Sequence, residues 1–130
     1  MSAPAGTTEM VEAGKPEVQV AHIAVCVCTY KRAVLLRRLL DELSRQETDG
    51  LFTYSVVIAD NDEARSAEPV ADAARTELGL AIKYCMEPRQ NIALARNKVV
   101  ENAEGNYLAF IDDDEFPCRE WLLTLFKTCR

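Results

Sequence analysis

The stretch YLAFIDDDE, residues 107–115, joins an apolar run directly to four consecutive carboxylates. Its first five residues have the composition of a buried β-strand. Four adjacent carboxylates repel one another, and they are costly at the mouth of a core unless a cation compensates them. Hard divalent cations such as Mg²⁺ or Mn²⁺ favour carboxylate oxygens and also accept phosphate oxygens. The stretch therefore predicts a strand followed by a binding site for a metal ion that holds a diphosphate. The alternative is a solvated acidic loop.

Three further strand-like runs precede this one, at residues 22–28, 54–59 and 80–85, and helical patterns separate them. The first run is apolar on both faces, as in a parallel strand that helices cover on each side. Strands that alternate with helices predict βαβ units, and hence an α/β fold with a parallel sheet and right-handed crossovers. We expect the spatial order third, second, first, fourth, which brings Thr29 beside Asp113.

Polar residues follow every predicted strand. Thr29 and Tyr30 follow the first, Asp60 the second, residues 87–91 the third, and the acidic run the fourth. Ligands of open parallel sheets bind beyond the carboxyl ends of the strands, so these residues form a site hypothesis. Neither a GxGxxG nor a Walker A pattern follows the first strand. A glycine-rich phosphate cradle is therefore excluded, and the acidic run with its metal is the expected substitute.

Length and composition narrow the class of protein further. A length of 130 residues predicts a single domain. The net charge of −6 argues against binding to nucleic acid, which would need a basic surface. Residues 1–20 are expected to be a flexible leader and residues 21–130 the folded domain. The five cysteines contain no CxxC pair and fit a reducing cytoplasm. The sequence predicts a cytoplasmic protein and leaves open a peripheral position at the inner face of the membrane.

Four segments together resemble the family 2 glycosyltransferases, and most of all their bacterial exopolysaccharide members of the succinoglycan type. They are CVCTYKR (26–32), VVIADND (56–62), EPRQNIALARN (87–97) and AFIDDDE (109–115). Each segment alone is a weak signal, but the four occur in the family's order and spacing. The resemblance covers about His22 to Phe126.

The resemblance implies a GT-A fold, a Rossmann-like nucleotide-binding sheet that continues into an acceptor-binding half. It implies transfer of a sugar from a nucleotide-diphosphate donor, typically a UDP-sugar, to a glycan or lipid-linked acceptor, with Mg²⁺ or Mn²⁺. It also implies roles for single residues. Asp112 and Asp114 would bind the metal, and the donor would contact Thr29, Tyr30, Asp60, Arg96, Asn97 and Asp113. Of these, Asp60 would accept a hydrogen bond from the nucleotide base, typically uracil.

The sequence stops at Arg130, only 15 residues after the acidic run, and two more expectations follow from this. The family's general base lies well downstream of the acidic run, so the chain is expected to be a donor-binding portion truncated before the acceptor half, with no assignable base. The fourth strand is expected to leave a sheet edge exposed, which favours self-association. Two alternatives stay open: a non-catalytic nucleotide-sugar-binding module, and a receiver-type signalling domain. The second is disfavoured because Thr29 and Tyr30 stand where a receiver carries its paired acids.

Overall fold

The computed structural model describes residues 9–12 and 20–129, and its centre is a five-stranded sheet in the order β1-β5-β2-β3-β4. β2 pairs in parallel with β3 and β5, and β3 pairs in parallel with β4. The predicted parallel α/β fold and the predicted order of its four strands are therefore confirmed. The strands are β1 (Glu9–Glu12), β2 (Ala21–Thr29), β3 (Phe52–Asp60), β4 (Ile82–Met86) and β5 (Tyr107–Phe110).

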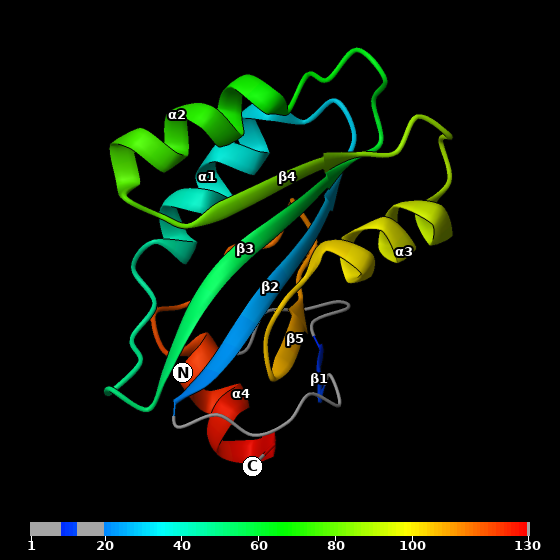
Figure 1. Ribbon diagram of the computed structural model, residues 1–130. Coiled ribbons are helices and arrows are strands. Elements are labelled where there is room, and N and C mark those ends of the chain that lie inside the picture. Colours follow the sequence, from blue (N-terminus) through cyan, green and yellow to red (C-terminus); the bar gives the residue numbers. More distant parts are fainter. Residues whose placement is uncertain (1–8, 13–19, 130) are drawn as a thin grey trace.

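Helices cover both faces of the sheet (Figure 1), because the central strands alternate their side chains between two separate cores. Ile23, Val25 and Val27 of β2 pack into the core under α1, α2 and α4. Ala24 and Cys26 face the smaller core under α3. This two-sided burial explains why β2 reads as a continuous apolar run. The helices are α1 (Ala33–Leu43), α2 (Glu68–Leu78), α3 (Ile92–Asn102) and α4 (Trp121–Cys129).

The amphipathic character of α1 follows directly from its sequence. Its leucines at helical spacing are buried, with Leu36, Leu39 and Leu40 fully so. Each such side chain contributes about 1.5–3 kcal/mol through burial. Arg37 lies on the other side of the helix and pairs with Asp41 one turn later and with Glu77 of α2. Within the described residues, no helix combines the length and the apolar character needed to cross a bilayer.

β1 corrects the expectation of a wholly flexible leader. Its four residues pair antiparallel with β5, in the register Glu9 with Phe110 through Glu12 with Tyr107. The free edge of β5 offers unpaired backbone groups, and a short strand from the same chain satisfies them. The expected exposed edge beside β5 is therefore wrong, because β1 covers it. The remainder of the predicted leader, residues 1–8 and 13–19, lies outside the described residues, as does Arg130.

Val11→Pro should release β1 and uncover β5. Val11 is 42% exposed, so the change removes little buried surface, whereas proline breaks strand geometry. We expect concentration-dependent self-association by sedimentation velocity or size-exclusion chromatography. Val11→Ala is the matched control and should behave like the parent chain. A monomeric Val11→Pro chain would show that β1 does not protect this edge.

Candidate functional site

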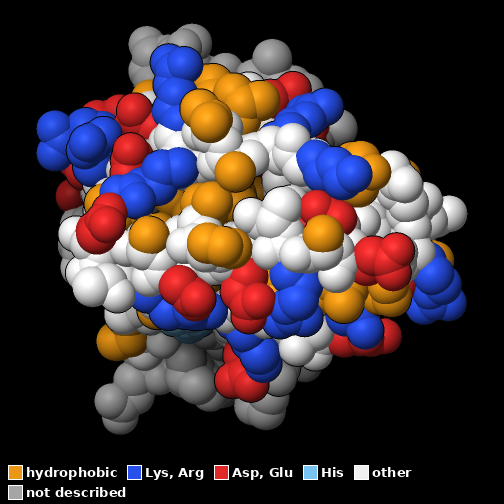
Figure 2. Space-filling view, turned by 90° about the horizontal axis from the view of Figure 1, so that it is seen from above, with side chains coloured by type: hydrophobic (Ala, Val, Ile, Leu, Met, Phe, Trp, Pro, Cys, Tyr) orange, Lys and Arg blue, Asp and Glu red, His pale blue; other side chains and the backbone are white. Residues whose placement is uncertain are grey.

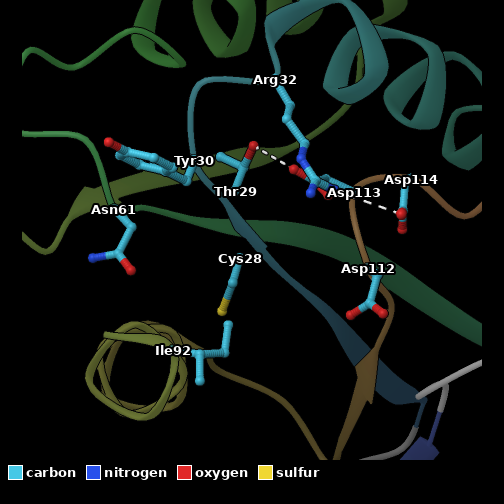
Figure 3. A pocket seen from close by; sticks show the side chains of 9 residues that line it. All are labelled: Cys28, Thr29, Tyr30, Arg32, Asn61, Ile92, Asp112, Asp113 and Asp114. Atoms are coloured by element: carbon cyan, nitrogen blue, oxygen red, sulfur yellow. Dashed lines mark hydrogen bonds and ion pairs between the residues drawn. The ribbon is translucent and has the colours of Figure 1, made fainter. Parts of the chain in front are cut away.

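A cavity of about 370 Å³ opens at the carboxyl ends of β2 and β5 (Figure 3). The predicted metal ligands and three of the predicted donor-binding residues meet there, drawn from loops more than 80 positions apart in the chain. Sequence reasoning had not assigned a role to four of the lining residues. The full lining is Cys28, Thr29, Tyr30, Arg32, Asn61, Ile92, Asp112, Asp113 and Asp114.

Thr29 and Asp113 form the centre of the site. The Thr29 hydroxyl donates to Asp113 Oδ2 at 2.8 Å, so the last residue of β2 holds the acidic run that follows β5. Both residues are at least 95% buried. Burial raises the pKa of the Asp113 carboxyl, while the Thr29 hydrogen bond and Arg32 act in the opposite direction. The expected neighbourhood of Thr29 and Asp113 is therefore confirmed.

Arg32 enters the site because the backbone reverses just before α1. Lys31 has φ +53°, a left-handed conformation that turns the chain out of β2. Arg32 is the N-cap residue of α1, and its side chain does not cap the helix. Its Nη1 instead donates to Asp113 Oδ1 at 3.1 Å and lies 3.5 Å from Asp114 Oδ2. A polar loop directly after a strand was the available signal, but it did not single out Arg32.

The acidic run forms a tight turn, and its three aspartates all line the cavity. Glu115 accepts the Asp112 backbone N–H at 3.0 Å, and its own N–H donates to the Asp112 carbonyl at 3.1 Å. Asp112 and Asp114 are exposed, and both line the cavity. The part of the chain that the structure describes has no preassembled group of three or more acidic, His or Cys ligands. Two carboxylates fit a hard divalent cation that keeps water or phosphate oxygens as its other ligands.

Tyr30, Cys28 and Ile92 supply less polar walls. Tyr30 comes directly after Thr29 in the sequence, and the Lys31 amine lies 5.3 Å from the centre of the Tyr30 ring. Burial raises the pKa of the Cys28 thiol to about 11, so this thiol is neutral at physiological pH and contributes a small apolar surface. Ile92, the first residue of α3, is 72% exposed. No sequence pattern marked Ile92, because its exposure depends on where α3 begins relative to β2.

Asn61 joins the loop after β3 to the loop before α3. Its Nδ2 donates to the carbonyls of Glu87 and Arg89, at 2.8 and 2.6 Å, and its Oδ1 accepts from the N–H of Asn91 at 3.1 Å. Asn91 in turn caps α3 by accepting the Leu94 N–H at 3.1 Å. Asn61 thereby fixes where α3 starts and where Ile92 stands beside the cavity.

Asp60 lies elsewhere than its assignment to the donor implied. The residue is fully buried and is not part of the cavity lining. Its Oδ1 accepts from the Asp62 N–H at 3.1 Å, and its Oδ2 accepts from the Ala67 N–H at 2.9 Å and the Tyr84 hydroxyl at 2.7 Å. These contacts tie together β3, β4 and the start of α2. Both oxygens of Asp60 therefore already accept hydrogen bonds within the fold, and its contact with the donor stays a prediction.

Arg96 and Asn97 also lie outside the cavity lining. The Arg96 guanidinium stacks over the Phe110 ring, 4.0 Å from its centre, and forms an ion pair with Glu9 of β1. Asn97 is exposed on α3. In this arrangement Arg96 attaches β1 and β5 to α3. The structure therefore brings together Thr29, Tyr30 and the three aspartates, and it does not add these two residues to them.

The face around the carboxyl ends of the strands carries charges of both signs. Figure 2 shows Lys and Arg side chains interspersed with Asp and Glu, and apolar patches between them. An extended basic footprint of the kind that binds nucleic acid is not visible on this face.

Comparison with known proteins places the chain in a family. The model for Glycosyl transferase family 2 matches residues 24–129. Succinoglycan biosynthesis protein ExoM of Rhizobium meliloti (strain 1021) is 38% identical over 84% of this chain and 35% of its own length. The chain thus spans about a third of the length of this curated relative.

Two solved structures share the fold. Staphylococcus aureus TarS 1–349 in complex with UDP has a TM-score of 0.68 at 23% identity, over 82% of this chain and 31% of TarS. Mannosyltransferase PcManGT from Pyrobaculum calidifontis, in complex with GDP-Man and Mn²⁺, has a TM-score of 0.65 at 23% identity, over 83% of this chain and 31% of that one. The sheet order, the acidic run beside the end of β2 and the match over residues 24–129 agree, and the chain belongs to glycosyl transferase family 2.

Proposed function

We propose that the chain is the donor-binding portion of a glycosyltransferase that takes a sugar from a UDP-sugar and passes it to a glycan or lipid-linked acceptor. The Thr29–Asp113 hydrogen bond carries this proposal, because it joins the acidic run to the loop of Tyr30 in one cavity. TarS was solved with UDP, and PcManGT was solved with GDP-Man and Mn²⁺, which supports a nucleotide sugar as the ligand class.

In this proposal, different residues of the cavity bind different parts of the donor. Tyr30 packs against the nucleoside, and Thr29 with Asp113 keeps the floor of the cavity rigid. Asp112 and Asp114 hold Mg²⁺ or Mn²⁺ against the diphosphate. When bound, such a cation neutralises the negative charge that develops on the departing diphosphate. Rigid positioning of the donor supplies a further part of the rate.

Acceptor binding and general-base catalysis are proposed for the whole transferase and are not assigned to residues of this chain. No described residue is assigned as the base, and the chain spans about a third of its curated relative ExoM. For this chain the proposal is therefore donor binding as one part of a transferase. A cytoplasmic location is also part of the proposal, and the absence of a disulfide among the cysteines of the described residues supports it.

Calorimetric titration with UDP tests the proposal. We expect UDP to bind more tightly with Mn²⁺ present than with a chelator, because the cation links the acidic run to the diphosphate. Inorganic pyrophosphate with Mn²⁺ should bind more weakly than UDP, because it lacks the nucleoside that contacts Tyr30. Equal UDP affinities with and without metal would contradict the metal role. Equal affinities for UDP and pyrophosphate would contradict the nucleoside role.

A further inference from the structure

Arg32 is the one cationic side chain among the nine residues that line the cavity. A single nitrogen, Nη1, contacts two neighbouring aspartates, at 3.1 Å from Asp113 and 3.5 Å from Asp114. The guanidinium therefore lies beside one of the two carboxylates assigned to the metal. A fixed cation in that position acts on any second cation that approaches Asp114.

The two ion pairs of Arg32 differ in strength. The Asp113 side chain is 7% exposed and is also held by Thr29, so it is a fixed partner. The Asp114 side chain is 53% exposed and its pair with Arg32 is longer. Solvent screens exposed pairs, and they contribute little to stability. The contact with Asp114 can therefore be exchanged at small cost while the contact with Asp113 stays in place.

We propose that Arg32 is a built-in counter-ion that competes with a divalent cation for Asp114 until the diphosphate of the nucleotide arrives. The inference rests on the proposed function and adds a positioning residue to it. A guanidinium presents planar donors that match phosphate oxygens as well as carboxylates. The diphosphate draws Arg32 from Asp114 and frees that carboxylate for the metal. Metal and nucleotide then bind cooperatively, and the coupling is the same in either order of addition.

Mn²⁺ titrations, followed by the electron paramagnetic resonance signal of free Mn²⁺, test this inference without any enzymatic turnover. Arg32→Gln should bind Mn²⁺ alone about threefold more tightly than the parent chain, the scale of one exposed ion pair. The gain in Mn²⁺ affinity on adding UDP should shrink in the same variant. Arg32→Lys should return Mn²⁺ affinity toward the parent value, because lysine restores a cation beside Asp114.

Arg38→Gln is the matched control. It removes the same charge from an exposed residue of α1, the helix that Arg32 precedes, but the Arg38 guanidinium stacks on the Phe116 ring, 4.2 Å from its centre, instead of pairing with an aspartate of the cavity. Thermal unfolding of each variant separates misfolding from a change in binding, and half-exposed Arg32 is expected to tolerate replacement.

Two results would overturn the inference: Mn²⁺ affinity of Arg32→Gln equal to or below that of the parent, or an increase that Arg38→Gln reproduces. Failure of the proposed function is recognised separately. It requires that UDP binding by the parent chain itself does not respond to Mn²⁺. A parent chain that responds to Mn²⁺, together with an unchanged Arg32→Gln, would reject the counter-ion and keep the donor site.

Discussion

Asp114→Ala is expected to abolish most of the effect of Mn²⁺ on UDP binding. Asp114 is an exposed carboxylate of the cavity, so its loss leaves the metal with Asp112 and the diphosphate alone. We expect Mn²⁺-supported UDP affinity to fall on the order of tenfold to a hundredfold, the range known for damaged metal sites. UDP affinity measured with a chelator should change much less. Calorimetric titration under both conditions gives the two values.

Asp72→Ala is the matched control for this prediction. It makes the same chemical change on α2, at an exposed residue that pairs with Arg75 outside the cavity. Its UDP affinity should keep the full response to Mn²⁺. An Asp114→Ala chain that also keeps the full response would place the metal elsewhere or remove it from the proposal.

Asp60→Ala is expected to have the largest effect on stability. The change leaves the N–H groups of Asp62 and Ala67 and the hydroxyl of Tyr84 without their buried acceptor. Unsatisfied buried groups cost about 1–3 kcal/mol each, so we expect a loss of about 3 kcal/mol or more in the free energy of unfolding. Urea denaturation measures this loss. Asp60→Asn should cost less, because its amide oxygen at the Oδ2 position still accepts from the Ala67 N–H and the Tyr84 hydroxyl, which leaves only the Asp62 N–H without its acceptor.

Ligand binding separates this structural role from the contact with a base that the family resemblance implies. If Asp60 acts only within the fold, Asp60→Asn should change the affinities for UDP and for pyrophosphate with Mn²⁺ by the same factor. Glu63→Ala, an exposed carboxylate in the same loop, is the control and should change neither stability nor binding. A stable Asp60→Asn chain that binds UDP more weakly, but binds pyrophosphate with Mn²⁺ as well as the parent chain does, would support the predicted contact of Asp60 with the nucleotide base.

The site also explains why the Thr29–Asp113 pair was predictable and Arg32 was not. Thr29 ends β2, and Asp113 lies in the acidic run just after the adjacent β5, so the predicted strand order places the two close together. Arg32 lies three residues beyond β2, where the left-handed turn at Lys31 decides its direction. The sequence gives no signal for that turn, because residues other than glycine seldom adopt a left-handed conformation and lysine would not be expected there.

From its sequence one can predict the parallel sheet, the order of β2, β3, β4 and β5 within it, and the acidic run at its carboxyl edge. Those features depend on local apolar periodicity and on the βαβ rhythm, which neighbouring residues establish. Which polar residues after the strands face the cavity depends instead on contacts between segments that are distant in the sequence. Asp60 turns inward because Tyr84 and Ala67 donate to it, and Arg96 is held by Glu9 and Phe110. Such contacts likewise decide that residues 9–12 form β1, because the unpaired edge of β5 supplies the hydrogen bonds that so short a segment cannot make alone.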